Sequence, residues 1–264
     1  MRKKILSRLP ASYPWRGNIH YFDAIDSTNT RAKQMAAEGA PHGTVLVADA
    51  QTGGRGRMGR SFHSPAGRGV YLSMVLRPRC PAADLLHLTC AAAVATADGI
   101  QAATGLRPQI KWTNDLVVGQ KKLGGILTEL SLNSTGSVDF AVIGIGINCS
   151  QEAEDFPEDI RSIATSLALA TGKTIDRASV IAQILVALQK MSKNLQDPAT
   201  AIFRYRADCI TIGKEISLVR GDEILHGKAL DVDENGALVV QFSNEQVTAV
   251  NSGEVSVRGM YGYI

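Results

Sequence analysis

The chain has 264 residues, of which 45% are hydrophobic and 20% are charged, and its formal net charge is +3. This composition is typical of a globular protein with one large domain, or with one domain and a small appendage. Because the net charge is small, it does not by itself indicate a nucleic-acid-binding protein. The four cysteines form no C-x-x-C pair, which argues against a zinc site or a disulfide framework and favours a reducing compartment.

The sequence contains no predicted secretory signal and no predicted membrane-spanning segment. The opening MRKKILSRLP is basic, but its apolar run is too short for a secretory signal. No apolar stretch approaches the length of a membrane span. We therefore expect a cytoplasmic protein with no membrane association.

In the first 150 residues the pattern predicts strands that alternate with helices. Residues 1–17 contain Pro10, Pro14 and Gly17 and are predicted to be an irregular arm. Ser27 is predicted to cap a helix that runs to about Glu38. A long buried helix is expected at 82–104, and 109–115 is expected to pair with 121–130 around a turn at Gly119-Gln120. The remaining predicted strands are 20–22, 44–50, 70–76 and 138–148.

The rest of the chain changes character near residue 211. Residues 150–175 are acidic at first and are expected to form a loop, and helices are expected at 179–193 and from Pro198 to near Cys209. After Gly213 short β-branched runs separated by turn residues indicate a small barrel of four or five strands. The sequence thus predicts an α/β (α+β) domain at 1–211 and a small β-barrel domain at 212–264.

Residues 51–61, QTGGRGRMGRS, match three different motifs. Gly54, Gly56 and Gly59 spell the G-x-G-x-x-G of a dinucleotide-binding fold, and the same stretch resembles a P-loop in which Arg60 replaces the lysine. Both motifs require a helix directly after the loop. The following SFHSPAGRGVYLSM is too rich in proline and glycine for a helix. We therefore predict a flexible loop between two strands.

Arginine at alternate positions gives this loop planar, permanently charged groups that suit phosphate or carboxylate oxygens. Glycine lets the backbone approach a ligand closely. We expect the loop to close over a small anionic ligand. The alternatives are a solvated turn and a weak RNA contact, although aromatic side chains for stacking on bases are scarce nearby.

Three further segments are candidates for the same site. Lys111 in KWTND lies on a predicted strand and is placed to stabilise a negative α-phosphate during acyl transfer; the alternative is a surface lysine. STN at 27–29 offers hydroxyl and amide groups to a polar ring, or serves only as a helix cap. The glycines of GIGIN either pack a strand end against a ligand or pack two strands closely.

The order of these segments resembles the biotin–protein ligases. STN, QTxGRGRxGR, YLSMVL, KWxND, KLGGIL and GIGIN follow one another across residues 20–150, and a terminal GEVSVR resembles the end of the small C-terminal barrel of that family. The resemblance implies a mixed, mostly antiparallel sheet related to the class II synthetase core. It also implies a two-step reaction with magnesium, in which biotin and ATP form biotinyl-5′-adenylate and pyrophosphate. The biotinyl group is then transferred to a lysine of a biotin carboxyl carrier domain of acetyl-CoA carboxylase.

The resemblance also implies roles for individual residues. Lys111 matches a lysine that contacts the biotin carboxylate and the α-phosphate, and with Arg57 it is the expected catalytic residue. The positions implied for biotin binding are Ser27, Thr28, Asn29, Gln51, Arg55, Gly56, Arg57 and Lys111. Those implied for nucleotide binding are Arg57, Arg60, Lys111, Asn148 and Arg258. No metal ligand is assigned, although Asp115 is a candidate for magnesium and is equally suited to orienting Lys111.

Two positions depart from the family pattern, since Thr113 replaces a proline and Phe62 replaces a tryptophan. The 17 residues before the core are too few for a helix-turn-helix domain, so we expect no DNA binding. A homodimer is compatible with the resemblance. The nearest alternative function is a lipoate–protein ligase of the same fold, and a more distant one is a non-enzymatic RNA-binding module.

Overall fold

A computed structural model describes residues 1–220, 223–243, 245–251, 253–257 and 260. Its larger sheet has seven strands in the order β1-β2-β3-β7-β6-β5-β4. β1 and β2 are parallel, and every other pairing in this sheet is antiparallel. The predicted mixed, mostly antiparallel sheet is therefore confirmed. The strand bounds are β1 Ile19–Ile25, β2 Val45–Gln51, β3 Gly69–Leu76, β4 Gln109–Lys111, β5 Asp115–Val118, β6 Lys121–Leu132 and β7 Val138–Asn148.

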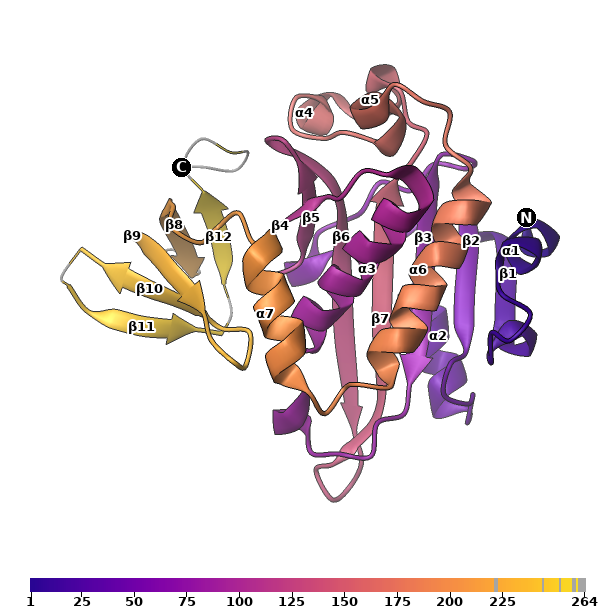
Figure 1. Cartoon of the computed structure of the whole chain (residues 1–264), viewed down its shortest axis with the longest axis horizontal. Coiled ribbons are helices and arrows are strands. Elements are labelled where there is room, and N and C mark those ends of the chain that lie inside the picture. Colours follow the sequence, from indigo (N-terminus) through magenta and orange to yellow (C-terminus); the bar gives the residue numbers. More distant parts are fainter. Residues whose placement is uncertain (221–222, 244, 252, 258–259, 261–264) are drawn as a thin grey trace.

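Helices pack on both faces of this sheet. α3 (Leu88–Thr104), α6 (Arg177–Ser192) and α7 (Pro198–Asp208) lie across the face turned towards the viewer in Figure 1. α2 (Thr28–Ala37) packs on the opposite face. There a small cluster joins its Ala32 and Ala36 to one residue each of β2 and β3 and to two alternate residues of β7, namely Leu46, Val75, Phe140 and Val142. The predicted helix at 28–38 is thus confirmed, as are the helices that end near Lys193 and Cys209.

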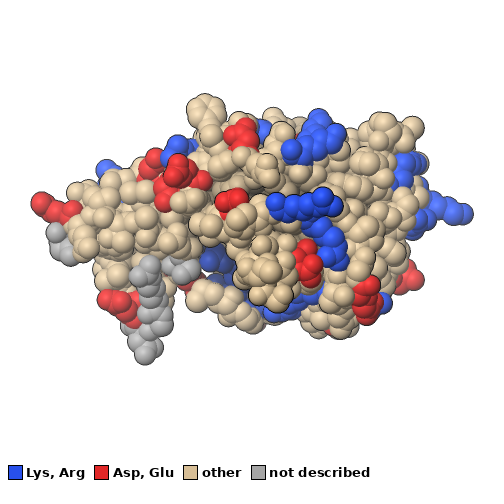
Figure 2. Space-filling model, turned by 90° about the horizontal axis from the view of Figure 1, so that it is seen from below, with Lys and Arg blue, Asp and Glu red and all other residues tan. Residues whose placement is uncertain are grey.

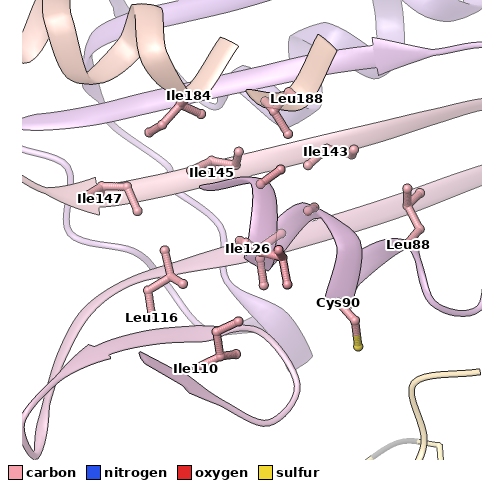
Figure 3. Packing of buried hydrophobic residues seen from close by; sticks show 14 of the residues in the cluster. Leu88, Cys90, Ile110, Leu116, Ile126, Ile143, Ile145, Ile147, Ile184 and Leu188 are labelled. Carbon is pink, nitrogen blue, oxygen red and sulfur yellow. The ribbon is translucent and has the colours of Figure 1, made fainter. Parts of the chain in front are cut away.

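The main core lies between the sheet and α3 and α6. Successive side chains of a strand point to opposite faces, so alternate residues of β7 share one face, and Ile143, Ile145 and Ile147 lie next to Ile184 and Leu188 of α6 (Figure 3). All four cysteines are buried and reduced. Burial raises the pKa of the Cys90 and Cys149 thiols to about 12, so both stay protonated at neutral pH.

The C-terminal region forms a second, five-stranded antiparallel sheet in the order β11-β10-β9-β8-β12. It lies beside α7, at the left of Figure 1, and Arg206 of α7 donates a hydrogen bond of 2.7 Å to the Val232 carbonyl. A C-terminal β domain is therefore present, whereas its start at residue 212 stays a prediction. The strand bounds are β8 Glu215–Arg220, β9 Glu223–Val232, β10 Leu238–Phe242, β11 Val247–Val250 and β12 Glu254–Val257.

The N-terminal arm was expected to be irregular, and this is wrong for its first part. Arg2–Arg8 forms helix α1, in which Ile5 is fully buried and joins the main core. Burial of one apolar face stabilises this helix despite its shortness. The helix ends two residues before Pro10, as expected because proline cannot continue it.

The segment 109–130 also differs from expectation. The chain turns at Trp112–Asn114, so 109–115 is two strands rather than one. β4 pairs with β5, and β5, not β4, pairs with β6 across the turn at Gly119-Gln120. Lys111 therefore ends a strand, directly before a tight turn.

Two helical boundaries differ as well. The long helix begins at Leu88 and not at residue 82, because 82–85 form a separate 3-10 turn after Pro81. The segment 150–175, expected to be a loop, contains α4 (Glu158–Arg161) and α5 (Leu167–Thr171). The Ser166 hydroxyl caps α5, and Gly172 with φ +66° ends it.

Within the part of the chain that the structure describes, no helix is both long and apolar enough to cross a bilayer.

Candidate active site

A cavity of about 430 Å³ lies where β12 of the C-terminal sheet approaches the larger sheet. Its walls come from the start of α2, the 51–61 loop, the turn after β4, the middle of β6 and β7, and the segment 156–164. It brings together ten of the eleven residues predicted for the site, namely Ser27, Thr28, Asn29, Gln51, Arg55, Gly56, Arg57, Arg60, Lys111 and Asn148. Arg258, the eleventh, lies outside the described residues.

At one end of the cavity, uncharged polar side chains hydrogen-bond to one another. Gln51 Oε1 accepts from the Thr28 main-chain N–H at 2.8 Å and from the Thr28 hydroxyl at 3.0 Å. Gln51 Nε2 donates to Ser64 Oγ at 3.0 Å. The Ser73 hydroxyl lies 2.8 Å from Thr28 Oγ1 and 2.6 Å from Asn29 Oδ1, and is fully buried. We call this network the polar end of the cavity.

Asn29 is the most constrained member of the polar end. Its Nδ2 donates to the Leu127 carbonyl at 3.3 Å and to Glu129 Oε2 at 2.9 Å. Gly144 of β7 faces its amide so closely that a Cβ there would lie 2.0 Å from Asn29 Oδ1. Gly144 is therefore required for the close approach of α2 to β7, which is packing of a helix on a strand and not of two strands. Because Gly144 also lines the cavity, its contact with a ligand stays a prediction.

Glu129 of β6 connects the polar end to the arginine loop. Lys33 Nζ lies 2.7 Å from its carboxylate and Arg55 NH1 lies 3.5 Å away. Partial burial alone would raise the pKa of Glu129, but the hydrogen bonds from Lys33 and Asn29 outweigh it and hold that pKa below its usual range. The carboxylate is therefore ionised at neutral pH and holds three donors in place.

The 51–61 loop runs from β2 to β3 without an intervening α-helix. This confirms that neither a dinucleotide-binding motif nor a P-loop is present. The loop forms a small hairpin in which the Gly56 N–H donates to the Arg60 carbonyl at 2.7 Å. At its tip Met58 has φ +53° and is 68% exposed. Apolar side chains at left-handed φ are uncommon, which marks the tip as a place where the chain is strained.

A second set of side chains that line the cavity carries the cations, and we call it the charged end. Arg57 NH1 donates to Asn114 Oδ1 at 3.0 Å. Arg60 forms an ion pair with Glu254 of β12, which connects the loop to the C-terminal sheet. Lys122 of β6 lies 2.7 Å from Asp115. All these side chains line the cavity.

Lys111 is the most buried of these cations, with 6% of its surface exposed. Burial lowers the pKa of its ammonium group, the Asp115 carboxylate opposes this effect, and Lys122 adds to it. An ammonium group held in so dry a place interacts strongly with a phosphate, because water screens the interaction little. This geometry favours the role predicted for Lys111 over that of a surface lysine.

Asn148, at the end of β7, has its amide already engaged. Its Nδ2 donates to the Thr165 carbonyl at 3.0 Å, and its Oδ1 accepts from Gln151 at 3.1 Å. Nearby, the Phe62 ring covers Gly146, where a Cβ would lie 2.7 Å from the ring. The phenylalanine at this position thus fills the cavity wall between the loop and β7.

Several side chains of the site were missed in the sequence. Ser73 carries a signal, since it is the one polar residue in the buried run VYLSMVL, and buried polar groups require hydrogen-bond partners. Glu129 carries none, because its position depends on strand pairing. Asn114, Lys122 and Glu254 fall in the KWxND, KLGGIL and GEVSVR segments, but these segments alone do not show which side chains face the cavity.

Among the described residues, no group of three or more His, Cys, Asp or Glu is placed to hold a metal ion. The described carboxylates that line the cavity are Asp115 and Glu254.

Comparison with known proteins places this geometry in a family. Residues 21–148 match the biotin/lipoate A/B protein ligase family, and residues 211–258 match the biotin protein ligase C-terminal domain. The chain is 38% identical over 242 residues to the bifunctional ligase/repressor BirA of Bacillus spizizenii, a match that covers 91% of this chain and 74% of the relative. It is 31% identical over 236 residues to the biotin–[acetyl-CoA-carboxylase] ligase of Mycobacterium tuberculosis, covering 87% and 85%.

The fold is similar to that of solved biotin protein ligases. The structure of the Aquifex aeolicus enzyme in complex with biotin and ATP matches with a TM-score of 0.77 and 31% identity, over 91% of this chain and 98% of that one. Both the sequence and the fold therefore agree along most of the chain. The chain belongs to the biotin/lipoate A/B protein ligase family, and within it to the biotin protein ligases.

Proposed function

We propose that this protein activates biotin with ATP and transfers the biotinyl group to a lysine of a biotin carboxyl carrier domain. The observation that carries the proposal is that one cavity is lined both by members of a network of uncharged polar groups and by a cluster of cations. A polar, uncharged ring and a carboxylate joined to a phosphate require these two environments. The Aquifex aeolicus relative that was solved with biotin and ATP supports the assignment.

In the first step a carboxylate oxygen of biotin attacks the α-phosphorus of ATP. A bond forms between that oxygen and phosphorus, and the bond from the α-phosphorus to the bridging oxygen of pyrophosphate breaks. Lys111 attracts the α-phosphate oxygens while it remains protonated, and Arg57 from the loop adds a second charge. Fixed cations of this kind stabilise charge that develops in the transition state.

In the second step the neutral amine of the acceptor lysine attacks the acyl carbon of biotinyl-5′-adenylate. The C–N bond forms, the amine loses a proton, and AMP leaves as the C–O bond breaks. The Arg60–Glu254 ion pair joins the loop to β12 beside the cavity. We expect the loop to close over the adenylate and to exclude water, which would otherwise hydrolyse it. Asn148, with its amide fixed by Thr165 and Gln151, is proposed to contact the nucleotide.

Magnesium fits the site as a partner of the substrate. Mg²⁺ usually keeps several waters and binds one or two carboxylates together with substrate phosphates. The Asp115 carboxylate lines the charged end and would hold the ion there, where it would neutralise charge on the departing pyrophosphate.

The test is the exchange of labelled pyrophosphate into ATP, measured with biotin, with lipoate and with neither. The proposal predicts exchange that requires biotin, followed by a mass increase of a carboxyl carrier domain that is lost when its acceptor lysine is replaced by arginine. Exchange with lipoate alone would keep the family and overturn the substrate. No exchange with either acid would contradict the proposal.

The RNA-binding alternative receives little support. On the face shown in Figure 2, basic and acidic side chains are interspersed and do not form one basic surface. The absence of DNA binding, a cytoplasmic location and a possible homodimer stay predictions. A mobility shift of DNA by this chain at near-physiological salt would contradict the first of them.

A further inference from the structure

Two turns of the same design occur in the molecule, at 133–136 and 233–236. In each, the side-chain Oδ1 of the first residue accepts two hydrogen bonds, from the main-chain N–H groups two and four residues later. Both hydrogen bonds are 3.0 Å long for Asn133, and they are 2.9 and 2.8 Å long for Asp233. The fourth residue is glycine with φ +79° in the first turn and +85° in the second. Both turns are therefore held in one rigid shape by their own hydrogen bonds.

Their surroundings differ. The first turn is exposed at the tip of the β6–β7 hairpin, and a Cβ on Gly136 would meet no atom within 4 Å. In the second, Gly236 is buried and a Cβ would lie 2.9 Å from Cys90 Sγ of α3. The Gly236 carbonyl accepts a hydrogen bond of 2.9 Å from Trp112 Nε1. The second turn thus joins the C-terminal sheet to the residue that directly follows Lys111.

The main chain around Trp112 is held from the other side by the segment that precedes the C-terminal sheet. The Trp112 N–H donates to Thr211 Oγ1 at 2.9 Å, and the Tyr205 hydroxyl donates to the Thr113 carbonyl at 2.9 Å. The indole is 4% exposed. These contacts restrict the conformation of the turn at 112–114, which directly follows Lys111. The Trp112 indole is the group through which this turn contacts turn 233–236.

We propose that Trp112 is a positioning residue, through which turn 233–236 of the C-terminal sheet fixes Lys111 at the charged end of the cavity. The proposal rests on the proposed function, because it concerns the step in which Lys111 faces the α-phosphate. Small displacements of a group that acts in the transition state lower kcat more than they change ground-state binding.

The first test replaces Trp112 by phenylalanine, which keeps an aromatic ring and removes the N–H. Trp15→Phe is the matched control, since the other tryptophan packs on Tyr13 and His42 and does not line the cavity. In biotin-dependent pyrophosphate exchange, kcat of Trp112→Phe is expected to fall about tenfold, the effect of one lost hydrogen bond. KM for biotin and for ATP should stay within about twofold. Because Trp112 also lines the cavity, a raised KM with unchanged kcat would mean direct substrate contact and would overturn the proposal.

The second test changes residues that do not line the cavity. Gly236→Ala and Gly136→Ala place the same strain in the two turns, but only the former adds a contact with Cys90 and displaces the carbonyl that Trp112 binds. Gly236→Ala is expected to lower kcat, whereas Gly136→Ala leaves it unchanged. The double variant Trp112→Phe/Gly236→Ala should be no slower than the slower single variant, because both changes break one contact. Equal effects of the two glycine variants, or additive effects in the double variant, would overturn the proposal.

A third measurement does not require activity. The reaction of Lys111 with an amine-reactive acylating reagent is followed by mass spectrometry, with the exposed Lys121 as the internal reference. Trp112→Phe should increase labelling of Lys111 relative to Lys121 at least about threefold, because the buried ammonium becomes accessible, and Trp15→Phe should not. Unchanged labelling would overturn the positioning role. If the unaltered protein showed no biotin-dependent exchange, the proposed function would fail, and this measurement would still decide the role of Trp112.

Discussion

The two ends of the cavity are built from different chemistry. At the polar end, Thr28, Asn29, Gln51 and Ser73 satisfy one another through short hydrogen bonds and are held by α2, β2 and β3. At the charged end, the cations extend from a loop and from the ends of strands β4 and β6. They pair there with side chains that a phosphate can replace, as in the pairs Arg57–Asn114, Arg60–Glu254 and Lys122–Asp115.

This difference indicates that the polar end contributes mainly to binding and the charged end mainly to the reaction rate. A preorganised network binds a neutral polar ring without having to be reordered, so it contributes affinity. Cations whose partners are exchangeable hold their charge ready until a substrate with phosphates arrives, and they contribute to the rate. Changes at the polar end should therefore raise KM for biotin, and changes at the charged end should lower kcat.

The largest effect is expected at Lys111. Lys111→Ala removes the most buried cation of the charged end and should lower kcat of biotin-dependent pyrophosphate exchange by about 10²–10³. Lys121→Ala, on an exposed lysine at the start of β6, is the control and should change kcat little. A kcat for Lys111→Ala within a few-fold of the unaltered protein would contradict the assignment.

Gly144→Ala should produce the next largest effect. The new methyl group would lie 2.0 Å from an Asn29 amide that is held by three hydrogen bonds, so α2 must move. Overpacking of this kind costs about 1–3 kcal/mol, and KM for biotin should rise by up to about 10². Gly125→Ala is the control, since a Cβ there meets nothing nearer than 3.5 Å in the same cavity. Similar KM values for the two variants would disprove the account of the polar end.

Ser73→Ala should weaken biotin binding more modestly. It leaves Asn29 Oδ1 without its hydroxyl donor, and an unsatisfied buried acceptor costs about 1–3 kcal/mol. We expect KM for biotin to rise about tenfold while KM for ATP stays constant. Ser7→Ala in α1, where the hydroxyl is exposed, should change neither constant.

The smallest effect at neutral pH concerns titration. Lys111 must stay protonated to attract the α-phosphate. Burial lowers its pKa below the usual 10.5, and the positive charges of Lys122 and Arg60 lower that pKa further. The carboxylates of Asp115 and Glu254 raise it, but they do not outweigh burial. Activity should therefore fall as pH rises through this lowered pKa, by at most about tenfold per pH unit. Lys111→Arg keeps its charge at any accessible pH. If the alkaline decline remained at the same pH in Lys111→Arg, another group would be responsible.

The sequence predicted the elements that carry the candidate site residues better than the elements next to them. Segments such as STN at 27–29 and the arginine loop were placed correctly because their elements follow from strong local signals, namely a capping serine and a β-branched run that leads into glycine. The break in 109–115 was not predictable in this way. The turn at Trp112 is stabilised by Thr211, Tyr205 and Gly236, all of which are about 90 or more residues away.

Contacts between residues that are far apart in the sequence also explain which site residues were missed. Glu129 lies 100 positions from Asn29 and meets it only because β6 pairs with β7 beneath α2. Glu254 meets Arg60 across 194 positions. Helix α1 was missed for a related reason, since its stability comes from burial of Ile5 against the core and not from its own sequence.

The most direct test of the division between the two ends is calorimetric titration of biotin alone into Gly144→Ala and Lys111→Ala. The account predicts that Gly144→Ala weakens biotin binding as much as it raises KM, whereas Lys111→Ala changes binding at most a few-fold despite its loss of activity. Strong loss of biotin binding in Lys111→Ala together with unchanged binding in Gly144→Ala would contradict it.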